Sequence, residues 1–354
     1  MSAILVSAIL VIVIQELIVL FGKFFRFVLV SIIPVISFSS PTVSHDLTIF
    51  TIGTGGAAYT YHPVGGMLAN AISNPPQALP CGKGGNCTLK NLIAVSVLSN
   101  GSIDNVTAIS EGKINSGFVQ SDIAYWMYTG TDISGQKQPK TNLRAIASLY
   151  EEHVQLVTLK RSGIETIQDL RGKRVAIDEP GSGTRVDAQL ILEASGIYEE
   201  DFQARSLRGK DAANALRLGA IDAFFVVAGY PTDLISELAS RVDINIVPID
   251  SAAADGLTSE YEFFISNIIP SGTYRGVEET ETLSVGALWI TSAEEDEELI
   301  YGVTSTLWSN STRKLLDVGH ARGKDITIDT ALYGIGIPLH PGAERFYEEK
   351  GLLE

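Results

Sequence analysis

The chain has few of the residues that usually carry metal or nucleophile chemistry. Its five histidines are scattered, without the spacing of a metal site. No glycine loop continues into Lys-Ser or Lys-Thr, and no Gly-x-Ser-x-Gly elbow occurs. The common signatures of a nucleotide P-loop and of an α/β hydrolase are therefore missing. We expect no cofactor, no metal site and no catalytic residues.

Cysteine is scarce as well, and its two positions lie close together. Cys81 and Cys87 flank a short loop that contains three glycines. In an exported protein, two nearby thiols on a flexible loop are expected to form a disulfide. Two free thiols are the alternative if the chain stays in the cytosol.

Basic residues are few relative to acidic ones. The chain has 26 Lys and Arg against 41 Asp and Glu, for a formal net charge of −15. Such a surface repels phosphate backbones and anionic lipid, so we expect no nucleic-acid partner. A small anionic ligand is not excluded, because a few aimed backbone amides can outweigh a distant net charge.

Charge is almost missing from the first 38 residues, where apolar runs dominate. Lys23 and Arg26 precede the apolar run Phe27–Phe38, and small residues follow up to Ser44. This is the layout of a signal peptide, and we expect cleavage after Ser44. A retained N-terminal anchor is the alternative for residues 1–44, because Met1–Leu20 is nearly long enough to cross a bilayer.

Strands and helices are predicted to alternate from Leu47 to the C-terminus, which is typical of parallel sheets with helical crossovers. Two strands, Leu143–Leu149 and Val154–Lys160, are expected with an acidic bend between them. Helices are expected at Leu257–Phe264 and Glu294–Trp308. The strands are too numerous for one comfortable sheet, so we expect two α/β lobes.

The stretch from Leu47 to Asn70 combines a short strand, the glycine turn Gly53–Ala58 and a helix that starts near Pro63. This order predicts an anion site, because the first amides of a helix lack partners and carry the positive end of its dipole. Four more turns rich in Gly, Ser or Thr follow strand ends: Ser99–Ser102, Gln120–Asp122, Pro180–Thr184 and Gly229–Thr232.

Any one of these turns is more often a plain chain reversal than a site, so their number is the argument. In open α/β sheets, ligands bind beyond the carboxyl ends of the strands, where such turns gather. The Gly53 turn also fits a loose dinucleotide fingerprint. That interpretation stays weak because Ile72–Gln77, where an acidic residue should hold the ribose, contains none.

Several motifs then resemble one family in order along the chain. They are Ile52–Gly56, Tyr61–Gly66, Val119–Tyr125, Gly172–Val175, Glu179–Thr184 and Ile337–Arg345. The resemblance is to the TAXI branch of solute receptors, the extracytoplasmic binding subunits of TRAP transporters. It runs from about Leu47 to the C-terminus.

The resemblance implies a two-lobed periplasmic-binding-protein fold of type II character, with a ligand cleft between lobes joined by hinge strands. It places residues 45–158 and 283–354 in lobe 1 and residues 159–282 in lobe 2. It implies no catalysis. The receptor would capture a small carboxylate or amino-acid-like solute in the periplasm and hand it to membrane permease subunits driven by an ion gradient.

The resemblance also implies a set of ligand-facing residues. They are Gly55, Gly56, Tyr59, Ser99, Asn100, Gln120, Ser121, Ser182, Gly183, Thr184, Gly229 and Tyr230. The first turn departs from the family pattern, so Tyr61 is an alternative to Tyr59 as the ligand aromatic. Two other functions remain open: an exported nucleotide-dependent or hydrolytic enzyme, and a surface antigen whose cleft is vestigial.

Overall fold

The computed structural model describes residues 47–76, 78, 89–131, 138–249 and 251–353. The expected signal peptide or anchor and the Cys81–Cys87 pair lie outside these residues. Asp46 to Glu354 forms one compact unit. Within the part of the chain that the structure describes, every helix is too short or too polar to cross a bilayer.

Short apolar and β-branched runs form the strands, as their alternation predicts. The strands are β1 (Thr48–Gly53), β2 (Leu92–Val97), β3 (Ser116–Gln120), β4 (Leu143–Leu159), β5 (Arg174–Ala176), β6 (Gln203–Arg205), β7 (Ala223–Ala228), β8 (Ile244–Val247), β9 (Ile265–Ile269) and β10 (Thr280–Ser292). The helices are α2 (Tyr61–Ile72), α3 (Ser102–Ser110), α4 (Ser121–Thr129), α5 (Gly183–Ala194), α6 (Gly209–Arg217), α7 (Asp233–Arg241), α8 (Ser251–Glu260), α9 (Glu297–Leu307), α10 (Asn310–Gly319) and α11 (Pro341–Glu349).

All ten described strands belong to one hydrogen-bonded sheet, in the order β2-β1-β3-β10-β4-β7-β5-β6, with β8 on β4 and β9 on β10. The expectation that the strands are too numerous for one sheet is therefore wrong, although the two lobes are present. The triplets β2-β1-β3 and β7-β5-β6 are parallel, but β10 and β4 between them run antiparallel to their neighbours. These two strands join what would otherwise be two sheets.

The expected bend between two strands at residues 150–153 is also wrong. β4 is a single strand of 17 residues, and β10 has 13. Glu151, Glu152 and His153 stay extended because each pairs with a residue of β10, and His153 also pairs with β7. Two shifts in the β4–β10 register absorb the irregularity. The polar run marks no turn because its backbone is paired with neighbouring strands.

Helix bounds differ from the sequence expectation where capping decides them. The Asp296 carboxylate accepts a hydrogen bond from the Leu299 amide, so α9 begins at Glu297 rather than Glu294. α8 ends at Glu260, before the expected end at Phe264. Phe264 is buried instead, and the chain continues directly into β9, which pairs with β10. Tertiary pairing thus overrides the helical spacing of this segment.

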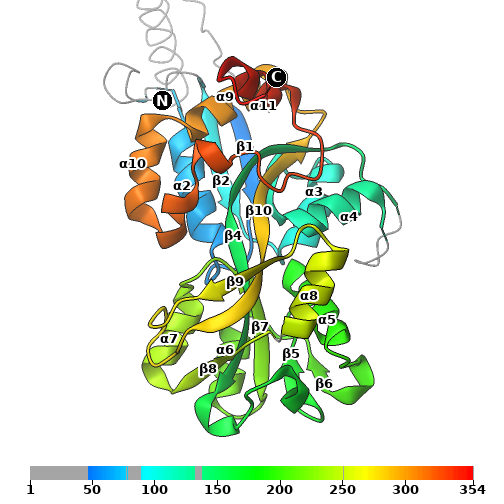
Figure 1. The fold of residues 1–354 in the computed structure, drawn as a ribbon. Helices are drawn as coiled ribbons and strands as arrows, with labels where there is room; N and C mark the ends of the chain where they lie inside the picture. Colours follow the sequence, from blue (N-terminus) through cyan, green and yellow to red (C-terminus); the bar gives the residue numbers. More distant parts are fainter. Residues whose placement is uncertain (1–46, 77, 79–88, 132–137, 250, 354) are drawn as a thin grey trace, which may run out of the picture. The chain divides into compact units, whose positions relative to one another are not determined.

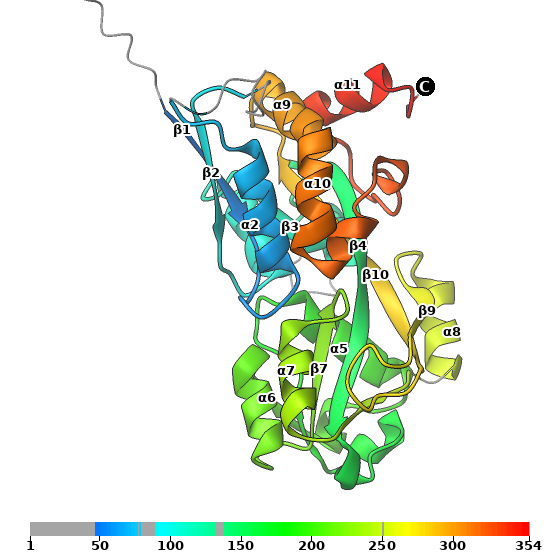
Figure 2. The same ribbon diagram turned by 90° about the vertical axis from the view of Figure 1, so that its left-hand side faces the viewer.

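The fold is a two-lobed α/β architecture, as expected. The first lobe contains β1–β3 with α2–α4 and α9–α11, and the second contains β5–β8 with α5–α8, while β4 and β10 extend through both (Figure 1). Helices α2 and α10 cover the face of the first lobe seen from the left, where α10 packs on α2 (Figure 2). The residue boundaries expected for the two lobes stay a prediction.

The core of the first lobe is centred on Phe118 of β3. Its ring is fully buried and packs edge-on against Tyr61 of α2, at 5.6 Å between centroids, and against Trp289 of β10, at 6.0 Å. These aromatic contacts link the first helix of the lobe to the shared strand β10. They hold the start of α2 in place at the edge of the sheet.

Phe118→Ala should lower the free energy of unfolding by about 3–5 kcal/mol, because it removes a fully buried ring and leaves a cavity. Val318→Ala is the control, since Val318 is 84% exposed and its truncation should change stability by less than about 0.5 kcal/mol. Urea unfolding followed by tryptophan fluorescence measures both. Equal effects of the two substitutions would contradict the assigned core.

Candidate functional site

The carboxyl ends of strands from both lobes meet at one small cavity, here called the interlobe cavity. Its volume is about 30 Å³, which is room for one or two water molecules. Nine of the residues expected to face the ligand line it: Gly55, Gly56, Tyr59, Tyr61, Asn100, Gln120, Ser182, Gly183 and Thr184. They come from four of the five predicted turns and from both lobes, so the structure brings most of the predicted set together. That they bind ligand stays a prediction.

Four expected residues do not line the interlobe cavity. The Ser99 hydroxyl donates a hydrogen bond to the Thr54 carbonyl, and Ser99 lines a surface groove instead of the interlobe cavity. The Thr60 hydroxyl donates a hydrogen bond to the Gly229 carbonyl, and the Arg322 side chain packs against the Cα of Gly229. Ser121 and Tyr230 face a different cavity on the other side of β4. The sequence placed these four residues after strand ends, but it did not indicate which side of the sheet each would face.

Sequence reasoning missed two acidic residues of the interlobe cavity. Glu152 and Asp178 line it and are only 3% and 2% exposed. Glu152 lies in the middle of β4, where a bend was expected. Asp178 lies two residues after the end of β5. The sequence carried one signal for Asp178, because it lies two residues before the predicted turn Pro180–Thr184. Nothing local marked Glu152, which depends on the register of a long strand.

Helix N-termini surround the interlobe cavity. Tyr61 begins α2, Ser102 begins α3, Gln120 precedes α4, and Ser182 precedes α5. None of these four helices has a side-chain hydrogen bond at its N-cap, whereas α7, α9, α10 and α11 do. The positive ends of four helix dipoles therefore point toward one place, which favours a negatively charged group there.

Direct hydrogen bonds close the cleft around this cavity. Gln120 Nε2 donates to Asp187 Oδ2 at 2.6 Å, and the Gly209 amide donates to Tyr59 Oη at 2.7 Å. The amide of Ile103 donates to the Gly181 carbonyl at 3.1 Å. Each bond joins the first lobe to the second, so the structure is that of a closed cleft.

Glycine is required where the two lobes touch. A Cβ added to Gly183 would lie 1.5 Å from Gln120 Oε1, and one added to Gly181 would lie 2.2 Å from Asp104 Oδ1. Gly181 also has φ +92°, a backbone conformation that residues other than glycine rarely adopt. The predicted turn Pro180–Thr184 is glycine-rich because the opposite lobe approaches its backbone this closely.

Carboxyl groups are buried in and behind the cavity. Burial raises the pKa of Glu152 to about 8 and that of Asp178 to about 6, because both lose hydration of the charged form. Burial likewise raises the pKa of both Asp122 and Asp187, which are fully inaccessible and lie against each other. Among the residues that the structure describes, none forms a hydrogen bond with the Tyr61 hydroxyl; burial raises the pKa of this hydroxyl, and the nearby Glu152 carboxyl raises it further.

A larger cavity, here called the rear cavity, lies on the opposite side of β4. Its volume is about 570 Å³, and Glu151, His153 and Tyr230 line it. Arg322, in the short helical turn Ala321–Asp325, stacks over the Tyr230 ring at 4.5 Å and pairs with Asp325 at 3.0 Å. Burial lowers the pKa of His153 to about 4, so this imidazole is neutral at physiological pH.

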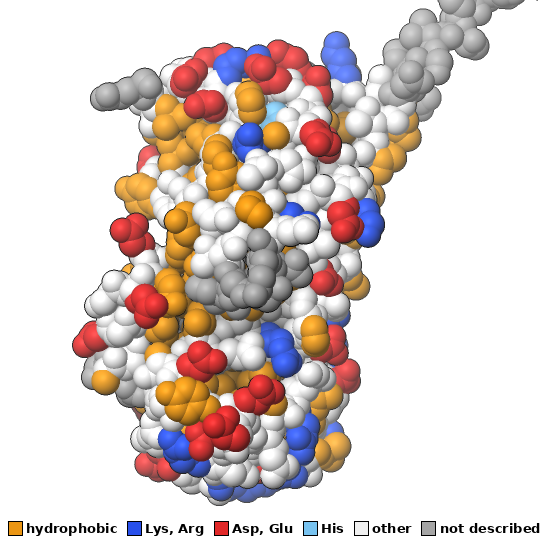
Figure 3. Space-filling model, turned by 90° about the vertical axis from the view of Figure 1, so that its right-hand side faces the viewer, with side chains coloured by type: hydrophobic (Ala, Val, Ile, Leu, Met, Phe, Trp, Pro, Cys, Tyr) orange, Lys and Arg blue, Asp and Glu red, His pale blue; other side chains and the backbone are white. Residues whose placement is uncertain are grey.

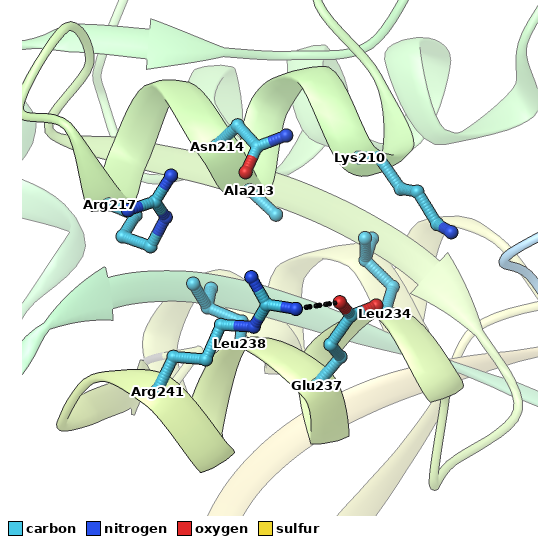
Figure 4. A pocket seen from close by; sticks show the side chains of 8 residues that line it. All are labelled: Lys210, Ala213, Asn214, Arg217, Leu234, Glu237, Leu238 and Arg241. Carbon is cyan, nitrogen blue, oxygen red and sulfur yellow. Dashed lines mark hydrogen bonds and ion pairs between the residues drawn. The ribbon is translucent and has the colours of Figure 1, made fainter.

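Other surface features lie away from the cleft. A shallow pocket between α6 and α7 has about 50 Å³, and the Arg241–Glu237 ion pair spans 2.6 Å on its wall (Figure 4). Acidic side chains are scattered among basic ones over the face drawn in Figure 3 rather than gathered in one patch. Among the described residues, no group of three or more His, Cys, Asp or Glu is arranged to hold a metal ion.

The fold and the cleft together define a two-lobed α/β protein that closes on a small polar cavity. The sequence profile of the NMT1-like family matches residues 52–351, which cover both lobes. The chain therefore belongs to the NMT1-like family.

Solved structures with a similar chain path include the alkanesulfonate-binding protein SsuA from Xanthomonas axonopodis pv. citri bound to MOPS. It is 18% identical, with 85% of this chain and 83% of that one covered and a TM-score of 0.47. PhnD1 from Prochlorococcus marinus in complex with methylphosphonate is 9% identical, with 86% and 99% covered and a TM-score of 0.47. Similarity at these values indicates nothing about the ligand of this chain.

Gly183→Ala should lower the free energy of unfolding by about 1–3 kcal/mol, because the added methyl group displaces the Gln120 amide from its bond to Asp187. Gly256→Ala is the matched control. Gly256 is also helical, and a Cβ there meets nothing within 4 Å, so the control should be neutral or slightly stabilising. Urea unfolding distinguishes the two. A neutral Gly183→Ala would mean that the lobes do not close as described.

Proposed function

We propose that this protein is an extracytoplasmic solute-binding receptor that delivers a small solute to a membrane transporter. The observation that carries the proposal is the closed cleft, in which four helix N-termini and two carboxyl groups from both lobes face one cavity. Such a cavity is sequestered from solvent when the lobes meet, and opening of the lobes releases its contents. This arrangement suits capture and release rather than chemistry.

The lining favours a zwitterionic solute of the amino-acid class over a dicarboxylate. The helix N-termini suit a carboxylate. Asp178 and Glu152 suit an ammonium group, since an ionised carboxylate accepts hydrogen bonds and attracts positive charge, and an ammonium group beside Glu152 would favour the ionised form of this carboxyl, whose pKa burial otherwise raises to about 8. A second carboxylate of the solute would face these two acids at close range. The residues proposed to bind the solute are therefore the nine predicted ones that line the cavity, together with Glu152 and Asp178.

Further parts of the proposal rest on the sequence. The resemblance to the TAXI branch supports a TRAP-type permease as the membrane partner, and the N-terminal segment supports periplasmic location after cleavage. The disulfide between Cys81 and Cys87 belongs to the same expectation. We propose no catalytic role.

A thermal-shift screen tests the proposal. The mature protein is heated with each of the twenty proteinogenic amino acids and with succinate, malate and 2-oxoglutarate. A solute present at a hundredfold its dissociation constant adds about 2.7 kcal/mol of stability, and we expect such a shift with at least one amino acid. A shift with the dicarboxylates alone would reject the ammonium assignment.

Two variants show whether a shift arises in the cleft. Gly183→Trp places an indole ring in the contact between the lobes and should abolish the shift. Gly256→Trp adds the same ring on the exposed side of α8, where nothing lies within 4 Å, and should keep it. If no solute shifts the melting temperature of the unaltered protein, the vestigial-cleft alternative gains over the receptor.

A further inference from the structure

The rear cavity has no part in the proposed function, although it is the larger of the two spaces beside β4. Its volume of about 570 Å³ lies within the range of about 300–1,000 Å³ that is typical of small-molecule sites. Both lobes contribute to its wall: Arg322 and Thr327 follow α10 of the first lobe, and Phe263 follows α8 of the second. Tyr230 belongs to the predicted turn Gly229–Thr232, whose residues lie outside the lining of the interlobe cavity.

The Arg322 side chain is held in place on the wall of the rear cavity. Its guanidinium carbon lies 4.5 Å from the centre of the Tyr230 ring, and Nη1 pairs with Asp325 Oδ2 at 3.0 Å. The aliphatic part packs against Gly229, where an added Cβ would lie 2.6 Å from Arg322 Cγ. A side chain fixed at three points is preorganised, so it loses little conformational freedom when it binds a ligand.

Part of this guanidinium group is available to a ligand. Arg322 Nη2 forms no hydrogen bond or ion pair with any residue that the structure describes, yet it is not buried. Lys324 also lines the cavity, and its ammonium group has no partner in the described part of the chain. Two cationic groups with donors to spare suit a carboxylate, whose geometry the planar guanidinium matches.

Two of the acidic residues around the cavity are engaged by neighbouring side chains. Asp325 pairs with Arg322, and Glu151 Oε2 accepts a hydrogen bond from Asn267 Nδ2 at 2.5 Å. Glu262 is exposed and belongs to the lining as well. Because acids line the cavity together with the two basic groups, a ligand with a single negative charge is favoured over one with two.

Aromatic side chains form much of the remaining wall. They are Tyr150, His153, Tyr230, Phe263 and Tyr333. His153 packs edge-on against Tyr230, at 4.5 Å between ring centroids. Its ring adds no charge, because burial lowers the pKa of His153 to about 4. Aromatic rings pack favourably edge-on or offset against other rings, so this wall suits an aromatic ligand.

We propose that the rear cavity is a second binding site, for a small aromatic molecule that carries one carboxylate group. Arg322 and Lys324 bind the carboxylate, and Tyr230 and Phe263 contact the ring. The two cavities lie on opposite sides of β4 and share no lining residue, so both can be occupied at once. The inference does not depend on the proposed function, because it uses no residue of the interlobe cavity.

Isothermal titration calorimetry of the mature protein tests the chemical class of the ligand. At least one of phenylacetate and indole-3-acetate should bind with one site per chain. The corresponding amide keeps the ring without the charge and should bind at least about tenfold more weakly, because hydrogen bonds between two charged groups are lost. Cyclohexylacetate keeps the carboxylate without an aromatic ring and should also bind more weakly than phenylacetate.

Substitutions on the wall test where the probe binds. Arg322→Gln should weaken binding by about tenfold or more, and Lys324→Gln by about two- to fivefold, because Lys324 is exposed to solvent. Arg241→Gln is the matched control and should leave binding unchanged. Arg241 is also ion-paired, with Glu237 at 2.6 Å, but it lines the pocket between α6 and α7 (Figure 4). Circular dichroism verifies that each variant is folded.

Asp178→Asn separates the rear cavity from the interlobe cavity. It removes an acid that lines only the interlobe cavity and should leave binding of the aromatic carboxylate unchanged. Weaker binding in Asp178→Asn together with full affinity in Arg322→Gln would place the probe in the interlobe cavity and overturn the proposal. If Arg322→Gln does not fold, full affinity in Lys324→Gln overturns it instead.

Two results with the unaltered protein would also overturn the proposal. They are the absence of binding by both aromatic carboxylates, and equal affinity for a carboxylate and its amide. These results are distinguishable from a failure of the thermal-shift screen, because the probes carry no amino group. A failed screen with a positive titration would reject the receptor and keep the rear site, and the reverse would keep the receptor alone.

Discussion

The antiparallel pairing of β4 with β10 is the constraint on which the rest of the structure depends. These two strands run through both lobes and carry the only sheet hydrogen bonds that connect β1–β3 with β5–β7 among the described strands. Each lobe contributes its own parallel triplet, and the shared pair is the continuous part of the sheet between them. The turns at the strand ends then face each other across a gap whose width the shared strands control.

The chemistry of the cleft is a balance between two opposing features of its wall. Four helix N-termini bring positive potential, and the carboxyl groups of Glu152, Asp178, Asp122 and Asp187 bring negative charge that burial partly neutralises by raising their pKa values. Both features lie in a chain that is strongly acidic as a whole. The zwitterionic solute that we propose would meet both signs of charge in this cavity.

Much of the fold and part of the site could be predicted because their causes are local. The turn Pro180–Thr184 and the Gly53 turn are marked by glycine, and the structure brings both to the interlobe cavity. Ser121 and Tyr230 line the rear cavity instead of the interlobe cavity, because the side of β4 that a residue faces depends on strand pairing that no short motif records. Glu152 was missed for the same reason. A strand of 17 residues that is held by partners on both edges ignores the local preference for a bend.

The side chains of β4 alternate between its two faces, and this alternation has a structural consequence. Neighbouring side chains of an extended strand point to opposite faces, so Glu152 belongs to the interlobe cavity while Glu151 and His153 belong to the rear cavity. The strand is thus a partition between a space of about 30 Å³ and one of about 570 Å³. A shift of β4 by one residue against its partners would therefore move Glu152 from the smaller space to the larger one.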